Sequence, residues 1–207
     1  MVSNEEISVN KRNGRGKESL QIDKIHAMVG FATEGITGVS ASHVEMNSGI
    51  QLFDGISTAD IQQILIKSAN DLITLENPNY QYVAARLLLF SLRKQLFHRL
   101  WDHPKLIDHI KKLIDMGLYD KDILVNYDES EIDRMDMWID HERDYNFTYA
   151  GLRQVMDKYL VQDRSTGDIF ETPQFMYMMI SATLFAQYPK DKRMSYVKKY
   201  YDAVSKF

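Results

Sequence analysis

Residues 11–24 read KRNGRGKESLQIDK, and this stretch is the most distinctive part of the chain. It carries five cations and two acids, a local charge of +3 in a chain whose net charge is −4. Its glycines, Gly14 and Gly16, allow the backbone a positive φ and a tight turn. Apolar residues alternate with polar ones on both sides of the stretch, at Ile7, Val9, Leu20 and Ile22. The pattern predicts a short β-hairpin with a basic loop.

A helix is predicted directly after this hairpin. Asp23 is the expected N-cap, which places Lys24 in the first turn of the helix. The free N–H groups and the dipole of a helix start favour an anion. Cations from the loop and from the helix start would then form a clamp for a polyphosphate. The alternative is a solvated basic turn, and composition alone leaves both interpretations open.

Composition indicates an ordinary globular protein of 207 residues, with 44% hydrophobic and 26% charged residues. No apolar run is long enough to span a membrane, and the polar start is unlike a signal peptide, so we expect a cytoplasmic protein without a membrane partner. The absence of cysteine excludes disulfides, thiolate metal sites and a cysteine nucleophile or radical on this chain. The acidic balance argues against a nucleic-acid partner.

One stretch of the second half is strongly acidic. Residues 115–144 carry eleven acids and three bases. A solvated helical surface would explain this charge, and so would a basic partner.

Helical periodicity dominates the first hundred residues. Helices are expected from Asp23 to near Gly35, over about 42–52, from a Ser57–Asp60 capping box to Pro78, and over about 79–100. The last of these is apolar on more than one side, which predicts central burial. A small sheet covered by about four helices, forming one compact domain, fits this half.

The second half is also predicted to be helical, with helices over about 104–117, up to 140, 147–158, 174–187 and from Pro189 to the end. Thr172 and Pro173 suit the N-cap and N1 positions of the helix at 174–187. A hairpin is expected around 163–167, with a positive φ at Gly167. Apolar stripes on the last two helices need partners, so this half is either part of a larger domain or a small domain that packs on the first.

The residues offer no believable reaction centre. Six histidines are scattered without metal-ligand spacing, and no known phosphate loop or nucleophile motif occurs. The cluster 141–144 (His-Glu-Arg-Asp) is most typical of a structural ion-pair network. We therefore predict no catalytic residue and no metal site on this chain.

Several motifs together resemble a known family. Residues 11–14, 22–25, 54–61 and 80–86 resemble the ATP-cone domain of the large subunit of class I ribonucleotide reductase. Residues 140–144, 158–162, 166–171, 173–175 and 201–207 resemble the helical lead-in to the ten-stranded α/β barrel of that subunit. The resemblance implies a mainly α (α+β) fold. Its ATP cone would span residues 1–97, a four-helix bundle with a small sheet, and the incomplete helical part of the catalytic domain would span 98–207.

The resemblance also implies a function, the control of ribonucleotide reduction by ATP as activator and dATP as inhibitor, with Mg²⁺ accompanying the nucleotide. The family's nucleotide contacts fall on Lys11, Arg12, Glu18, Gln21, Lys24, Thr58, Gln62 and Lys94. Two departures from the family pattern occur, a one-residue insertion around 15–17 and Gln62 at a position that usually holds histidine. A glutamine cannot carry a proton as histidine does, which puts discrimination between dATP and ATP in question.

The catalytic cysteines of that family have no counterpart here. We therefore expect the N-terminal piece of a split or truncated, phage-like large subunit. Its partners would be a C-terminal fragment that carries the cysteines and, in the assembled enzyme, the radical-generating small subunit. The alternatives are a stand-alone ATP-cone regulator and an inert structural fragment with a degenerate cone.

Overall fold

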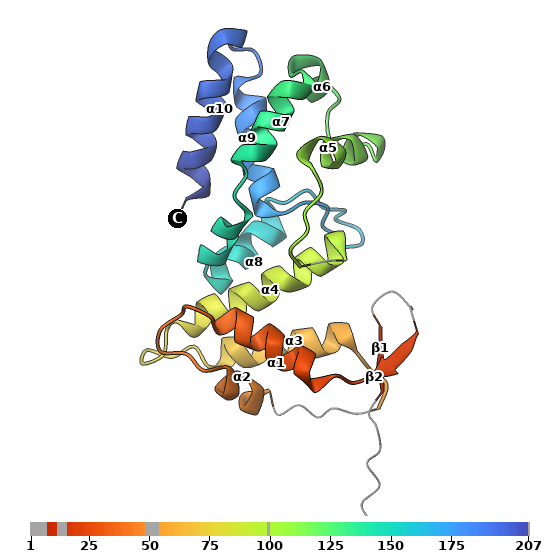
Figure 1. Ribbon diagram of the computed structural model, residues 1–207, viewed down its shortest axis with the longest axis vertical. Coiled ribbons are helices and arrows are strands. Elements are labelled where there is room, and N and C mark those ends of the chain that lie inside the picture. The colour runs from red at the N-terminus through yellow and green to blue at the C-terminus, as the bar shows by residue number, and fades with distance from the viewer. Residues whose placement is uncertain (1–7, 12–15, 49–53, 99, 207) are drawn as a thin grey trace, which may run out of the picture. The chain divides into compact units, whose positions relative to one another are not determined.

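The computed structural model describes residues 8–11, 16–48, 54–98 and 100–206. The chain is mostly helical with one small sheet, which confirms the predicted fold class (Figure 1). It divides into two compact units. Unit 1 comprises Met1–Ser91 and Phe147–Leu152, and unit 2 comprises Leu92–Asn146 and Arg153–Phe207.

The sheet of unit 1 has three short strands, β1 (Ser8–Asn10), β2 (Lys17–Ser19) and β3 (Ile56–Ser57), in the order β2-β1-β3. β1 and β2 are antiparallel, which confirms the predicted hairpin, and Gly16 has a φ of +96°. Ile7 and Gly14 lie outside the described residues. β3 runs parallel to β1 and was not predicted, because two residues are too few to show an alternation.

The first helix of unit 1, α1 (Ile22–Thr33), begins earlier than predicted. Its N-cap is Gln21, so the prediction that Asp23 caps this helix is wrong, and Asp23 lies in the first turn. The reason is that the N–H of Lys24 already donates to the carbonyl of Gln21, at 3.1 Å, and closes a turn there. α2 (Ala41–Asn47) overlaps the predicted helix at about 42–52, of which residues 49–52 lie outside the described residues.

The predicted cap of α3 (Thr58–Asp71) is confirmed, since the Ser57 hydroxyl accepts a hydrogen bond of 3.0 Å from the N–H of Asp60. The predicted end at Pro78 is wrong, because the helix stops at Asp71. In the segment beyond it, the hydroxyl of Thr74 accepts a hydrogen bond of 3.1 Å from the N–H of Asn77. Such local bonds compete with helix continuation.

α4 (Tyr80–Phe97) is the central helix that its sequence predicted. Eleven of its residues are buried, at 80, 83–85 and 87–93. In unit 1 its Phe90 ring packs edge-on against Phe31 of α1, with 6.4 Å between ring centroids. Arg86 donates a hydrogen bond of 2.6 Å to the carbonyl of Glu34, just beyond α1. Both contacts fasten α1 to the first part of α4.

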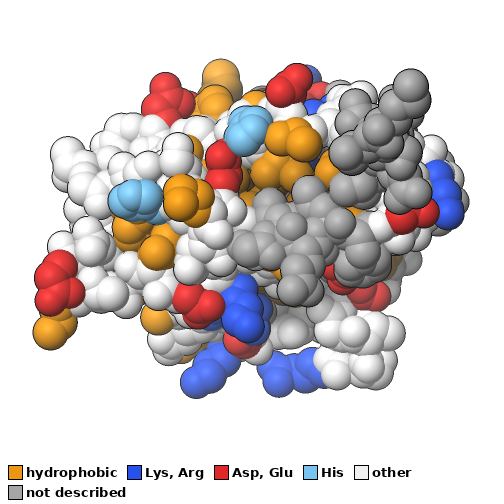
Figure 2. Space-filling model, turned by 90° about the horizontal axis from the view of Figure 1, so that it is seen from below, with side chains coloured by type: hydrophobic (Ala, Val, Ile, Leu, Met, Phe, Trp, Pro, Cys, Tyr) orange, Lys and Arg blue, Asp and Glu red, His pale blue; other side chains and the backbone are white. Residues whose placement is uncertain are grey.

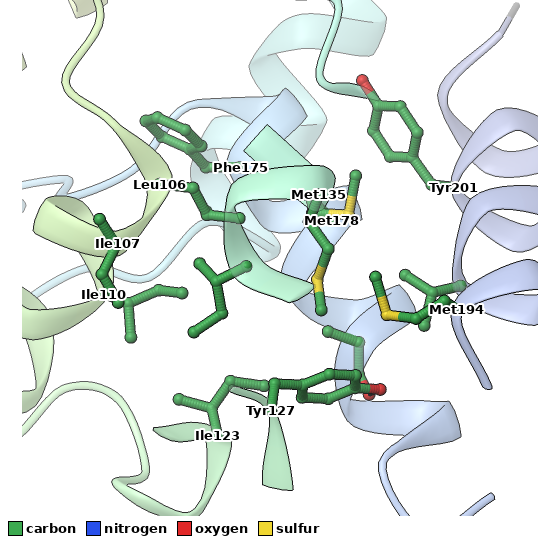
Figure 3. Packing of buried hydrophobic residues seen from close by; sticks show 13 residues of the cluster. Leu106, Ile107, Ile110, Ile123, Tyr127, Met135, Phe175, Met178, Met194 and Tyr201 are labelled. Atoms are coloured by element: carbon green, nitrogen blue, oxygen red, sulfur yellow. Dashed lines mark hydrogen bonds between the residues drawn. The ribbon is translucent and has the colours of Figure 1, made fainter. Parts of the chain in front are cut away.

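The helices of unit 2 are α5 (Leu106–Asp115), α6 (Asp122–Asn126), α7 (Glu129–Trp138), the 3-10 helix η2 (His141–Asn146), α9 (Pro173–Phe185) and α10 (Lys190–Ser205). α8 (Tyr149–Lys158) contributes residues to both units. α9 and α10 run side by side (Figure 1). Figure 3 shows the core of this unit, where Leu106 of α5, Phe175 and Met178 of α9, and Met194 and Tyr201 of α10 come together.

The predicted hairpin around 163–167 forms as a tight turn rather than as two strands. A single bridge joins Gln162 and Ile169, and Gly167 has the expected positive φ of +78°. The side chain of Asp163 accepts from the N–H of Ser165 at 2.8 Å, which fixes the turn locally. The predicted start of α9, with Thr172 as N-cap and Pro173 at N1, is confirmed.

The acidic stretch 115–144 has a basic partner within the same unit, the helix α10. Two ion pairs place a cation of α10 against an acid of the stretch, Lys190 with Asp128 at 2.8 Å and Arg193 with Glu131 at 2.5 Å. A third pair has the opposite sense, since Arg143 of the stretch lies 2.9 Å from Asp202 of α10. Part of this negative charge is therefore neutralised inside the fold. No helix among the described residues is long and apolar enough to cross a bilayer.

Candidate functional site

The small sheet of unit 1 brings two predicted site residues to the same end. β1 and β3 are parallel, with Asn10 opposite Ser57, and the next residues along the chain are Lys11 and Thr58. Because parallel strands end at the same edge, Lys11 and Thr58 both leave the sheet there. β2 begins at that edge too, since its first residue, Lys17, pairs with Asn10.

Side chains that are not among the predicted contacts fasten β1 to the turn at 54–55, which precedes β3. Ser8 donates to the Asp54 carboxylate from its N–H at 2.9 Å and from its hydroxyl at 2.6 Å. These bonds keep the pKa of Asp54 below its usual value. Asn10 donates at 2.6 Å to the carbonyl of Gly55, whose φ of +84° makes the turn before β3. The Asp-Gly pair at 54–55 was the available sequence signal, since this dipeptide is typical of turns.

Glu18 forms an ion pair with one predicted cation, Lys11, and is influenced by the charge of another, Lys24. Its carboxylate lies 2.8 Å from the ammonium of Lys11 across the hairpin. The pKa of Glu18 is lowered first by this hydrogen bond and also by the positive charges of Lys11 and Lys24. The structure thus brings Lys11, Glu18 and Lys24 into one electrostatic group.

The start of α1 adds backbone donors to this group. Gln21 occupies the N-cap, and its side chain makes no capping hydrogen bond. The first N–H groups of an uncapped helix are available to an acceptor, and the helix dipole favours a negative one. Lys24 is exposed in the same first turn. This helix start can therefore receive an anion.

The two predicted residues of α3 differ in exposure. Thr58 is the first residue of the helix and is partly exposed. Gln62, one turn later, is only 2% exposed, and its side-chain amide donates a hydrogen bond of 2.9 Å to the carbonyl of Leu87 in α4. Gln62 therefore connects α3 to α4 through this hydrogen bond.

Two further predicted residues lie outside the described part of unit 1. Arg12 lies outside the described residues. Lys94 lies in the last turn of α4 and belongs to unit 2. Their part in a nucleotide site stays a prediction.

The surface drawn in Figure 2 carries charges of both signs. Its Lys and Arg side chains have Asp and Glu side chains among and beside them. Independently of that view, Lys11 and Glu18 of the hairpin place opposite charges 2.8 Å apart. Such a surface suits a compact anion bound at one point better than a long polyanion, which needs a continuous basic stripe.

The His-Glu-Arg-Asp cluster of unit 2 contributes to two sets of ion pairs: Arg143 is partly buried and pairs with Asp140 and Asp202, whereas Asp144 is buried and pairs with Arg93. Asp144 is 1% exposed, accepts a hydrogen bond of 2.8 Å from Gln174 and lies 3.6 Å from the guanidinium of Arg93. Burial raises the pKa of Asp144 to about 6, although the charge of Arg93 acts in the opposite direction.

Two family descriptions match the chain. "ATP cone domain" matches residues 7–95, and "Ribonucleotide reductase, all-alpha domain" matches residues 145–207. The chain carries the ATP cone and the all-alpha domain of the ribonucleotide reductase family. The hairpin, the start of α1 and the start of α3 all fall within the matched cone.

Relatives of the chain are alpha subunits of ribonucleoside-diphosphate reductase. The subunits of Haemophilus influenzae and Escherichia coli K12 are each 48% identical to it over 204 residues, which is 99% of this chain and 27% and 26% of those proteins. The subunit of Enterobacteria phage T4 is 42% identical over 199 residues, 96% of this chain and 26% of that protein. The chain thus corresponds to the N-terminal region of these subunits and spans about a quarter of their length.

Proposed function

We propose that the cone binds ATP or dATP, accompanied by Mg²⁺, and that this binding regulates the reduction of ribonucleotides to deoxyribonucleotides. The proposed contacts are Lys11, Arg12, Glu18, Gln21, Lys24, Thr58, Gln62 and Lys94. In this proposal the phosphates lie at the basic loop and the start of α1, and Glu18 and Gln21 lie on the ribose and base side.

The observation that carries the proposal is the group formed by Lys11, Glu18 and Lys24 at the uncapped start of α1. Two ammonium groups and free backbone N–H groups are the donors that a polyphosphate requires. Lys11 and Lys24 are both exposed, so a ligand can reach them from solvent. This donor set fits a triphosphate better than it fits an uncharged ligand.

The ion pair between Lys11 and Glu18 gives the site a resting state. A phosphate that approaches Lys11 competes with the carboxylate of Glu18 for the same ammonium. Binding would therefore release Glu18, which could then accept hydrogen bonds from the ribose hydroxyls. The exchange links phosphate binding to recognition of the nucleoside.

Calorimetric titration of the full chain with Mg·ATP and Mg·dATP tests the proposal. We expect saturable binding of both nucleotides and a loss of about tenfold or more for Lys11→Ala and Lys24→Ala, because each removes a charged hydrogen bond worth about 1.5–3 kcal/mol. Lys17→Ala is the matched control, since Lys17 is an exposed lysine of the same hairpin that is not among the proposed contacts. Equal losses for all three variants would indicate general charge attraction. Absence of binding at millimolar nucleotide would refute the site.

We further propose that catalysis requires the part of the alpha subunit that the relatives have outside the matched quarter, supplied as a second chain, together with the radical-generating small subunit. The absence of cysteine from this chain supports the assignment of catalysis to that other part. In the assembled enzyme we expect ATP to raise and dATP to lower the rate of ribonucleoside diphosphate reduction. Lys11→Ala should abolish both responses while the rate without effector is unchanged.

A further inference from the structure

The position of α3 in unit 1 depends on a very short strand. β3 forms two residue pairs with β1, and the second of them joins Asn10 to Ser57. Lys11 follows the first strand directly, and α3 begins at Thr58, directly after β3. A shift of β3 by one residue along β1 would turn its side chains to the opposite face of the sheet. The register of this pair of strands therefore decides where Thr58 lies relative to Lys11.

Hydrophobic contact alone does not set the register. Val9 of β1 and Ile56 of β3 are buried, at 3% and 1% exposure, and hold the two strands together. The hydrophobic effect is not directional, whereas a hydrogen bond has a preferred distance and angle. The register must therefore be fixed by polar groups.

Four hydrogen bonds join β1 to the turn that leads into β3. The N–H of Gly55 donates to the carbonyl of Ser8 at 2.9 Å. The N–H and the hydroxyl of Ser8 both donate to the same oxygen of the Asp54 carboxylate, at 2.9 and 2.6 Å. The side-chain amide of Asn10 donates to the carbonyl of Gly55 at 2.6 Å. A slip of β3 along β1 could not occur without breaking these bonds.

The two side chains that make this connection suit the task. Gly55 has a φ of +84°, which glycine adopts without strain, and in this conformation its carbonyl lies within reach of Asn10. The hydrogen bonds from Ser8 lower the pKa of Asp54, and the positive charge of Lys17 lowers it further. Asp54 is thus an ionised acceptor at neutral pH. Asn10 and Asp54 are both exposed, so neither contributes to the hydrophobic core.

We propose that Asn10 and Asp54 are positioning residues of the nucleotide site, which fix the start of α3 relative to Lys11 without contacting the nucleotide. The inference rests on the proposed function and adds two residues that act through Lys11 and Thr58. A ligand held by both of these contacts requires a constant separation between the end of β1 and the start of α3. Contacts of this kind tolerate displacements of only about 0.5 Å.

Calorimetric titration of the full chain with Mg·ATP tests the proposal. Asn10→Ala and Asp54→Ala should each weaken binding about fivefold, because each removes a positioning hydrogen bond. Asp54→Asn should bind within about twofold of the unaltered chain, because its amide oxygen can still accept both bonds from Ser8. This variant also controls for charge, since it removes the carboxylate and keeps the acceptor.

Asn79→Ala is the matched control for Asn10→Ala. The side-chain amide of Asn79 donates at 2.9 Å to the carbonyl of Thr37, so it too forms an exposed bond between distant segments of unit 1. The two alanine variants should lose similar thermal stability, measured by circular dichroism, but Asn79→Ala should leave the affinity for Mg·ATP unchanged.

A double-mutant cycle separates positioning from an independent contribution to binding. If Asp54 acts through Lys11, then Lys11→Ala should cost about threefold in the Asp54→Ala background, compared with about tenfold in the unaltered chain. Additive losses would overturn the positioning role, and so would a failure of Asp54→Asn to restore the affinity.

The outcomes for the two proposals are distinguishable. Equal affinities of the Asn10→Ala, Asp54→Ala and Asn79→Ala variants would overturn the positioning role, while nucleotide binding by the unaltered chain would still support the proposed function. If the unaltered chain bound no nucleotide, both proposals would fail. If Asn10→Ala did not fold, the comparison of Asp54→Ala with Asp54→Asn would still decide the question.

Discussion

The side-chain amide of Gln62 donates a hydrogen bond of 2.9 Å to the main-chain carbonyl of Leu87, which joins α3 to α4 in the core of unit 1. Because Gln62 is only 2% exposed, water cannot replace this bond. We expect Gln62→Leu, which keeps the volume but removes the donor, to lower the free energy of unfolding by about 1 kcal/mol. Urea unfolding followed by circular dichroism measures the change.

The neighbouring Gln63 provides the matched control for this prediction. Gln63 is exposed on the same helix, so Gln63→Leu should change stability by less than about 0.5 kcal/mol. If the two variants were equally stable, the hydrogen bond to Leu87 would contribute nothing measurable. The result also bears on the site, because a side chain needed for packing is less free to turn toward a ligand.

Arg193 of α10 and Glu131 of α7 form a buried ion pair at 2.5 Å, and the guanidinium also lies over the ring of Tyr127, 4.4 Å from its centroid. The two partners are 7% and 1% exposed. Arg193→Leu leaves the carboxylate buried without its counter-ion, so we expect a loss of about 3 kcal/mol. Both tryptophans, Trp101 and Trp138, belong to unit 2, and their fluorescence during unfolding therefore reports on this unit.

A second substitution separates loss of charge balance from loss of packing. Glu131→Gln in the Arg193→Leu background removes the uncompensated charge and keeps the polar group that caps α7. We expect the double variant to recover about half of the lost stability. The exposed neighbour Lys192 is the control, and Lys192→Leu should be close to neutral. A double variant less stable than the single one would contradict the electrostatic explanation.

His109 makes unit 2 sensitive to acid. The residue is 3% exposed and stacks on Phe175, with 4.3 Å between ring centroids. Burial lowers the pKa of His109 to about 4, and the charge of Lys112 adds to the effect. The unfolded chain takes up the proton near pH 6.5, whereas the folded one resists it down to about pH 4. The stability contributed by neutral His109 is therefore complete above pH 6.5 and is lost as the pH falls toward 4.

His109→Phe isolates this contribution, because it keeps an aromatic ring against Phe175 and removes the titration. Between pH 7 and pH 5 the original chain should lose about 2 kcal/mol more than the variant. Asp144 works in the opposite direction, since its pKa of about 6 favours the fold at low pH. Asp144 is present in both proteins and cancels from the comparison. Tryptophan fluorescence follows the unfolding of both proteins. An equal dependence of their free energies of unfolding on pH would contradict the prediction.

Much of the fold could be predicted from local sequence signals. Ser57 and Asp60 gave the start of α3, the alternation around Gly16 gave the hairpin, and the apolar run of α4 gave its burial. These features depend on residues that are adjacent or one helical turn apart. Local rules failed at the end of α3. This helix was predicted to reach Pro78 but ends at Asp71, and in the segment beyond it the Thr74 side chain forms a local hydrogen bond that competes with a helix.

The long-range contacts could not be predicted in this way. Gln62 meets Leu87 across 25 positions, and Glu131 meets Arg193 across 62. No period in the sequence connects such pairs, because they depend on how helices pack. The same limit applies to the site, where the basic loop was evident but the parallel strand that leads into Thr58 was not.

The ion pair between Lys11 and Glu18 leads to a last prediction, which rests on the proposed nucleotide site. Glu18→Gln removes the negative charge that competes with a phosphate for Lys11. Inorganic tripolyphosphate should then bind several-fold more tightly, because the attraction of Lys11 and Lys24 is no longer offset. ATP should gain less than tripolyphosphate, since the variant also loses a carboxylate acceptor for the ribose. Calorimetric titrations at one ionic strength give the ratio of the two gains. Equal gains would leave Glu18 a purely electrostatic role, and a weaker tripolyphosphate complex would show that the phosphates bind elsewhere.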